Sequence, residues 1–160
     1  MTRAIGTLGD LFSISLSMGG YGYAISLNPI LAFFDLRTQS EMTLDSLDCV
    51  NPKIAFKAGV HISWNKRWHK IGHCAVGENL MQPVDFVRQD IISKDLYIYT
   101  RFPGNVEKFL ERLAPPEECV DLDPLWSWDP EQIEARLEAH LNNTEYTMLK
   151  NFKMRTQKKF

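Results

Sequence analysis

Residues 11–27 alternate between apolar and small polar side chains, and this constrains the fold more than any other feature of the chain. In residues 11–18 (LFSISLSM) every even-numbered residue is apolar, and the odd-numbered residues after Leu11 are serines. Gly19-Gly20 follows, and glycine readily adopts the positive φ angles that two-residue hairpin turns require. Alternation then resumes in residues 21–27 (YGYAISL). A side-chain period of two is typical of a strand with one buried face, so this stretch predicts a β-hairpin.

Four more segments have strand patterns. Residues 30–36 (ILAFFDL) form a short apolar run that suits a buried strand, and residues 53–64 alternate cleanly. A turn near Asn65-Lys66 would return the chain as a strand over residues 67–76, and residues 96–102 (LYIYTRF) predict another. Between the segments 30–36 and 53–64, residues 43–47 suggest a single helical turn.

The C-terminal half has helical spacing. From Asn105 the apolar residues follow i, i+3, i+4, i+7, and Pro115-Pro116 would end that helix. A second helix is expected to begin at Asp129, with Pro130 at its first position, and to end at Asn142-Asn143. Its apolar stripe consists of Ile133, Leu137 and Leu141.

Strands first and helices last predict an α+β fold. We expect a single domain over residues 1–143, with a mostly antiparallel sheet built from N-terminal hairpins and two helices in the C-terminal half. Residues 144–160 are expected to form a basic C-terminal tail that is a docking peptide, a specificity element or a disordered terminus.

The histidines of RWHKIGH (residues 67–73) raise the question of a metal site. On a helix, His69 and His73 would lie about 6 Å apart and could share an ion, whereas on a strand they would lie roughly 13 Å apart. Gly72 favours the strand, because glycine destabilises a helix by about 1 kcal/mol. A convergence of His61, His69 and His73 from neighbouring strands stays open as an alternative, but we predict no metal site, no cofactor and no catalytic residues.

Charge is unevenly distributed along the chain, although the formal net charge is only −2. Residues 145–160 carry five basic residues against Glu145, whereas residues 117–138 carry eight acidic residues against Arg136. The acidic stretch also contains two tryptophans, and carboxylates beside desolvated aromatic rings suit the docking of a basic protein. The alternative is a solvated loop with the tryptophans in the core. The candidate docking residues here are Glu117, Glu118, Asp121, Asp123, Asp129, Trp126 and Trp128.

Composition narrows the function classes. Without a strong basic field, nucleic-acid binding is disfavoured. No apolar run has the length of a membrane span, and no secretory signal is visible. Three cysteines without a CxxC pair suit a reducing compartment, so we expect a cytoplasmic protein. Motifs for nucleophilic catalysis or phosphate binding are also missing from the sequence.

The ordered set GDLFSISL, YGYAISLNPILAFFDL, WHKIGH, FVRQD, LYIY and PPEECVDLDPLWSWDPEQIEARLEAHL resembles the immunity protein 26 family of bacterial polymorphic toxin systems. The resemblance spans Gly6 to Leu141. Two departures are Ser15 where the family commonly has proline, and the extension after Asn143. The family positions that map onto this chain are Gly9, Asp10, Tyr21, Tyr23, Phe34, Asp35, Trp68, Gly72, Asp90, Glu118 and Trp126.

The resemblance implies a cytoplasmic antitoxin: an immunity protein that binds and neutralises a secreted toxin or one delivered by contact-dependent growth inhibition. The partner would be a toxin domain that is basic, most simply a nuclease, and Tyr21, Tyr23 and Trp68 join the candidate contacts. Some family members carry a phosphotriesterase label. The alternative is therefore a metal-dependent phosphoester hydrolase, with the three histidines as ligands and Asp90 or Asp35 completing the shell.

Overall fold

The predicted hairpin lies at the centre of a six-stranded sheet. In the computed structural model, which describes residues 6–61 and 63–157, β1 (Asp10–Ser15) pairs antiparallel with β2 (Tyr21–Ser26). The hairpin is confirmed, but its turn is not the predicted two-residue turn at Gly19-Gly20. The Gly19 N–H donates to the Leu16 carbonyl at 3.0 Å, so Ser17 and Met18 are the central residues of the turn. Gly19 and Gly20 follow them with positive φ, 98° and 84°.

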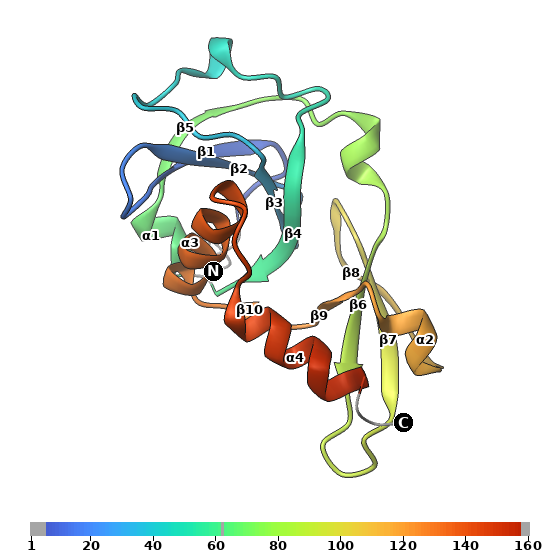
Figure 1. Cartoon of the computed structure of the whole chain (residues 1–160). Coiled ribbons are helices and arrows are strands. Elements are labelled where there is room, and N and C mark those ends of the chain that lie inside the picture. Colours follow the sequence, from blue (N-terminus) through green and yellow to red (C-terminus); the bar gives the residue numbers. More distant parts are fainter. Residues whose placement is uncertain (1–5, 62, 158–160) are drawn as a thin grey trace.

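The six-stranded sheet has the order β10-β4-β3-β2-β1-β5, and its pairs are antiparallel except β10–β4 (Figure 1). Its remaining strands are β3 (Leu31–Phe34), β4 (Ile54–Val60), β5 (His69–His73) and β10 (Ser127–Trp128).

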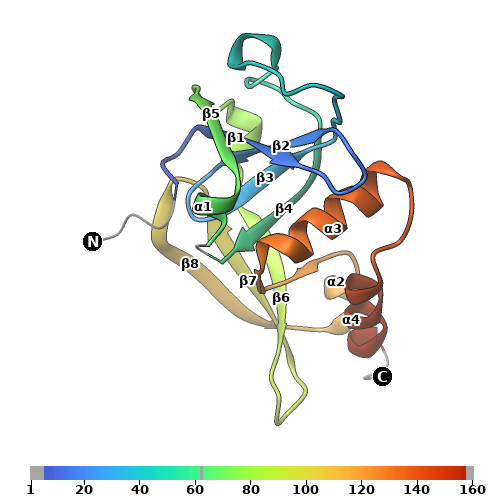
Figure 2. The ribbon, with the colours of Figure 1, turned by 90° about the vertical axis from the view of Figure 1, so that its left-hand side faces the viewer.

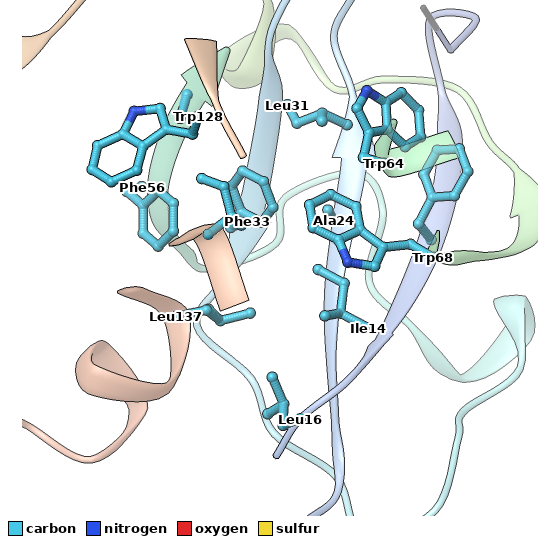
Figure 3. Close-up of a cluster of buried hydrophobic side chains, with 13 residues drawn as sticks. Ile14, Leu16, Ala24, Leu31, Phe33, Phe56, Trp64, Trp68, Trp128 and Leu137 are labelled. Atoms are coloured by element: carbon cyan, nitrogen blue, oxygen red, sulfur yellow. The ribbon is translucent and has the colours of Figure 1, made fainter. Parts of the chain in front are cut away.

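Both faces of this sheet are covered. One face packs against helix α3 (Pro130–Leu141) and the short helix α1 (Trp64–Arg67), and Figure 3 shows the aromatic side chains gathered there. The opposite face buries Leu11, Tyr23 and Ile25 against side chains from the connections that follow β3 and β5. Strands β1 to β3 are therefore almost wholly buried.

A second, four-stranded sheet has the order β8-β7-β6-β9, and Figure 2 shows its strands β6, β7 and β8. Residues 123–128 connect the two sheets, because β9 pairs parallel with β6 and β10 pairs parallel with β4. The strands are β6 (Val84–Gln89), β7 (Leu96–Phe102), β8 (Asn105–Ala114) and β9 (Asp123–Pro124).

The α+β class is confirmed, but the helix expected from Asn105 is wrong. Residues Asn105–Ala114 form β8, which pairs antiparallel with β7. The turn at Pro103-Gly104, with φ 81° at Gly104, reverses the chain. The register shifts after the Phe102–Asn105 pair, and regular pairing resumes at Arg101–Phe109. The ring of Phe109 stacks on Tyr99 of β7, with centroids 4.9 Å apart. Hydrogen bonding to β7 thus prevails over the helical spacing of the apolar residues.

Two strand predictions are too long, and the three strands β6, β9 and β10 were not predicted. The strand expected over residues 53–64 ends at Val60. The helix α1 begins at Trp64, whose ring packs edge-on against Phe12. Ile62 lies outside the described residues. The strand expected over 67–76 is confined to β5, and β6 had not been assigned. The predicted turn near 43–47 is confirmed as the 3-10 helix η1 (Leu44–Ser46), and a second 3-10 helix, η2, spans Glu78–Met81.

Helices dominate the C-terminal end. The helix predicted from Pro130 is confirmed as α3, with Gln132 Oε1 accepting a hydrogen bond from the backbone N–H of Asp129. The basic segment forms α4 (Thr147–Gln157), and Phe152 is buried; Lys158 and Lys159 lie outside the described residues. A short helix, α2 (Pro116–Cys119), follows β8. Across the described chain, none of the helices combines the length and apolar character needed to cross a membrane.

Candidate functional site

The acidic stretch does not form one free patch, because several of its carboxylates bind other parts of the chain. Asp123 pairs with the buried Arg136, and Glu118 accepts a hydrogen bond from Arg112 at 2.9 Å. Glu111 of β8 is paired in the same way with Arg88. Part of the acidic stretch therefore forms ion pairs within the chain and does not present free carboxylates.

Two acidic residues of α3 connect this helix to α1 and to the β1–β2 turn. Glu134 binds Arg67 and accepts the indole N–H of Trp68 at 2.8 Å, which ties α3 to α1. Burial raises the pKa of Glu134, but these partners outweigh it and hold that pKa below its usual range. Glu138 accepts backbone and hydroxyl hydrogen bonds from Ser17 at the β1–β2 turn. Of the predicted docking carboxylates, Glu117, Glu118, Asp121 and Asp129 are exposed, although Glu118 is paired with Arg112 and Asp129 is the N-cap of α3.

Most of the predicted aromatic contacts lie in the core. Trp128, Trp68 and Tyr23 are buried, and the Tyr23 hydroxyl accepts the backbone N–H of Met42 at 2.9 Å. Tyr21 is half-buried beside that core, and its backbone bonds to Thr38. In this conformation the three buried side chains serve packing and offer nothing to a partner.

Trp126 is the exception among the predicted aromatic contacts. It is half-buried between β9 and β10, and its ring contacts those of Trp128 and Phe152, each at 5.1 Å between centroids. Trp126 also lines a cavity of about 380 Å³ between the two sheets, together with Tyr99 and Arg101 of β7. An aromatic-lined cavity with a cation at its wall is suited to receive a side chain from a partner.

Strand β8 is the most exposed of the strands, and its Phe109 stacks on Tyr99, which lines the cavity. All of its residues except Ala114 are exposed, including four large apolar ones. Their exposed fractions are 40% for Val106, 52% for Phe109, 60% for Leu110 and 62% for Leu113. Exposed apolar side chains that lie together can mark an interaction site, and Phe109 and Leu113 lie on the same face of β8.

The ladder with β7 separates the β8 side chains into two faces. Phe109, Glu111 and Leu113 pair with Arg101, Tyr99 and Tyr97, so they share the face that continues to the cavity. Arg88 of β6 lies on that face as well, 4.5 Å from the Tyr97 ring centroid, and its bond to Glu111 raises its pKa. Leu110 and Arg112 pair with Thr100 and Ile98 on the opposite face.

The candidate metal ligands have separate partners. His69 bonds to Glu41 at 2.9 Å, His73 to Asp10 at 3.0 Å, and His61 to Ser63 at 3.1 Å. The two alternative carboxylates are also engaged elsewhere: Asp35 binds Lys53 and His140, and Asp90 caps the β6–β7 turn. Within residues 6–61 and 63–157, no three histidine, cysteine or acidic side chains come together as a metal site.

Two other polar clusters connect β1 to its neighbours. Ser13 donates to Glu41 at 2.9 Å, and Glu41 also bonds to His69. Nucleophilic catalysis needs the histidine between the serine and the acid, whereas here the acid lies in the middle. In the second cluster the buried Asp10 bonds to Lys70 and His73 of β5, so both clusters fit a bracing role between strands.

Comparisons with protein-family models, with curated proteins and with solved structures found no match to this chain. The surface must therefore be interpreted from its own geometry.

Sequence reasoning missed Phe109, Leu113, Tyr99 and Arg101 as surface residues. Only Pro103-Gly104 signalled them, because this dipeptide between two apolar segments is typical of a hairpin turn. A hairpin turn there makes β8 the antiparallel partner of β7, which was predicted correctly. The apolar residues that would form one face of a helix then lie on two faces of a strand.

Proposed function

We propose that this chain is an immunity protein that binds a toxin domain in the bacterial cytoplasm and blocks its active site or substrate surface. One observation carries the proposal: β8 and the adjoining cavity present exposed apolar side chains on a well-packed scaffold. A surface of this kind is suited to a protein partner, and the family resemblance of the sequence supplies the class of partner.

Blocking requires shape and affinity but no chemistry by the chain itself. The rings of Tyr99 and Phe109 are already stacked, so they can contact a partner without losing much side-chain freedom. The exposed Glu117 and Asp121 lie near the opposite face of the same sheet, since Glu118 of α2 is paired with Arg112, which is on that face. These carboxylates suit a basic toxin, such as a nuclease, because opposite charge accelerates association.

Co-expression tests the proposal. The toxin domain encoded beside this chain is expressed in a bacterial host, alone and together with the chain, and cell survival is counted. We expect survival only with the chain, and the Lys66→Glu variant on α1 should protect equally. A toxin domain with its active site inactivated controls for the burden of expression. Continued killing in the presence of abundant folded protein would refute the proposal.

The hydrolase alternative is separated by metal content. Untagged protein purified from the host is analysed for zinc and manganese by elemental analysis. We expect less than stoichiometric metal, because the candidate ligands have separate partners in the structure. One bound ion per chain, lost on replacing His69 or His73 with alanine, would favour hydrolysis over toxin binding.

A further inference from the structure

The cavity between the two sheets is lined by residues of both sheets and of the segment that joins them. β4 contributes Gly59, β7 contributes Tyr99 and Arg101, and the joining segment contributes Trp126 and Ser127. The volume of about 380 Å³ lies within the range of about 300–1,000 Å³ that is usual for ligand sites. The exposed apolar side chains of β8 lie outside the described lining, so a ligand in the cavity would leave them uncovered.

Arg101 brings a positive charge without a counter-charge to the cavity. Of the described residues in the lining, it alone is charged. Its guanidinium lies 5.8 Å from the ring centroid of Tyr99, and no carboxylate of the described chain forms an ion pair with it. Arg88, on the same face of the sheet, is by contrast paired with Glu111. Because a guanidinium stays protonated and bonds most strongly to carboxylates and phosphates, the cavity is suited to an anion.

Three further hydrogen-bond donors belong to lining residues and are not used within the fold. They are the Tyr99 hydroxyl, the Trp126 indole N–H and the Ser127 hydroxyl, which have no acceptor among the residues that the structure describes. A carboxylate or phosphate has several acceptor sites. One anionic group can therefore accept bonds from Arg101 and from a neighbouring donor together.

Aromatic rings form the walls beside these donors. The Trp126 ring contacts the rings of Trp128 and Phe152, each at 5.1 Å between centroids, and the Tyr99 ring stacks on Phe109. These contacts restrain both rings before any ligand binds, so a ligand does not need to order them. Aromatic rings pack well on other aromatic rings in offset or edge-to-face contact, which indicates that the apolar part of the ligand is aromatic.

Gly59 keeps the cavity open on the side of β4. Apart from its chain neighbours, a Cβ atom added at Gly59 would meet only the carbonyl oxygen of Trp126 among the described atoms, at 3.4 Å. The φ angle of Gly59 is not in the left-handed region, so the backbone would accept another residue. Glycine inside a strand weakens the strand, and it often marks a place where a ligand approaches closely. The missing side chain therefore leaves room for a ligand at this wall.

A second cavity, which shares Trp126 with the first, differs in its charges. It has a volume of about 350 Å³ and is lined by Arg88 and Lys94, but Asp90 lines it as well. Arg88 is also already paired with Glu111. A lining of mixed sign does not favour an anion, whereas the lining of the first cavity does.

We propose that the first cavity binds a small aromatic anion, whose carboxylate or phosphate pairs with Arg101 and whose ring packs against Trp126. Either anionic group satisfies the guanidinium in the same way, so the ring and the negative charge together define the ligand. The inference goes beyond the proposed immunity function and does not depend on it, because Phe109 and Leu113 of β8 lie outside the described lining of the cavity.

Naphthalene derivatives that differ in charge test the site. Naphthoate and naphthyl phosphate carry a negative charge, and naphthamide carries the same ring without it. Each is titrated into the full-length protein and followed by NMR, with the Trp126 indole N–H resonance assigned from the spectrum of Trp126→Phe. We expect at least one anion to shift that resonance and to bind about tenfold more tightly than naphthamide, as one charge-assisted hydrogen bond would give. Failure of both anions to bind at about 1 mM, or equal binding of naphthamide, would overturn the inference.

Two variants place the effect in the cavity. Arg101→Gln removes the charge, so it should weaken anion binding about tenfold and leave naphthamide binding unchanged. Gly59→Val adds a side chain that strands favour and fills the cavity, so it should abolish the binding of all the compounds. The matched control Arg112→Gln removes an equal charge from the opposite face of the sheet and should bind like the unsubstituted protein. Circular dichroism confirms the fold of each variant. Unchanged anion affinity in folded Arg101→Gln protein would place the anion elsewhere and overturn the inference.

Toxin binding separates this site from the immunity function. If neither anion binds but Arg101→Gln weakens toxin binding in calorimetric titration, the cavity receives a side chain of the toxin, and the small-molecule site is rejected. Anion binding without cell survival in the co-expression assay would reject the immunity function and retain the site. Survival without anion binding would reject the site and retain the immunity function.

Discussion

The six-stranded and four-stranded sheets are both mainly antiparallel, but they differ in what covers them. Strands β1 to β3 are buried on both faces, and the sheet is flanked by β5 and β10. In the four-stranded sheet, α2 and α4 contribute to a small core around Ile98, whereas β8 stays exposed. The difference separates two roles: the first sheet supplies most of the buried apolar area that stabilises the fold, and the second presents a surface.

The largest contrast is expected between Trp128 and Phe109. Trp128→Ala removes a side chain that is 1% exposed, so it should lower the free energy of unfolding by about 3–5 kcal/mol. Phe109→Ala, at a half-exposed position, should cost about 1 kcal/mol or less. Urea unfolding followed by fluorescence measures both. Comparable losses would show that β8 is part of the stabilising core.

A smaller effect is expected at the ion pair that joins β9 to α3. Asp123→Asn leaves the guanidinium of Arg136, whose side chain is 8% exposed, without its carboxylate and should cost about 3 kcal/mol. Replacing Asp123 by leucine and Arg136 by methionine together should cost less than Asp123→Asn alone, because no unpaired charge is left buried. Denaturant unfolding is measured for the unsubstituted protein, the single variant and the double variant. A double variant less stable than the single variant would contradict this expectation.

The Asp10 carboxylate should give a pH-dependent effect on stability. Burial raises its pKa, but hydrogen bonds from His73, Lys70 and the Thr7 N–H outweigh burial and hold the pKa below its usual range. Because the folded pKa is lower than the unfolded one, the stabilisation is present above about pH 4 and is lost as pH falls through the folded value.

Asp10→Asn should therefore cost about 2 kcal/mol at pH 7 and progressively less below pH 4. Thermal unfolding across pH 2.5–7 (roughly the range in which carboxyls titrate) measures the difference from the unsubstituted protein. The exposed Asp45→Asn serves as a control with little expected change. A cost of Asp10→Asn that is independent of pH would contradict the ion-pair account.

The smallest effect concerns thiol reactivity in the two regions. Burial raises the pKa of Cys119, and burial with the neighbouring Cys49 raises the pKa of Cys74 to about 12. Cys119 lies in the smaller core of the four-stranded sheet, which should open locally more often. Cys74 is partly exposed, so the matched comparison is with Cys49, which is buried in the core of the first sheet. We expect alkylation of Cys119 at pH 8 to precede that of Cys49 by about tenfold in rate. Mass spectrometry of the time course measures the alkylation of each cysteine, with Cys119→Ser as control. If Cys119 were alkylated second, the first sheet would be the one that opens more readily.

Local patterns predicted the first sheet better than the second. The hairpin of residues 11–27 follows from neighbouring residues alone, because the alternation is local and the glycines mark the reversal, although the turn itself is at Ser17-Met18. The apolar spacing of β8 fits a helix, and only its pairing with β7 makes it a strand. That pairing depends on tertiary contacts, so the sequence pattern by itself misled.

The candidate site, like the fold, was predicted only in part from the sequence. Trp126 was predicted from its acidic surroundings, and it does line the cavity. The ion pair between Asp123 and Arg136 could not be foreseen, because it joins β9 to α3 through the fold and takes a carboxylate out of the predicted docking patch. Side chains that become surface only through strand pairing, such as Phe109, escaped notice for the same reason.

Calorimetric titration of the toxin domain into Phe109→Lys/Leu113→Lys protein tests the central claim, that β8 is the binding surface, most directly. The matched control is Ile91→Lys/Ile92→Lys, which places the same two lysines at exposed apolar positions of the β6–β7 turn. We predict affinity about 100-fold weaker for the β8 variant and unchanged for the control, with both proteins equally stable. Wild-type affinity in a folded β8 variant would contradict the account.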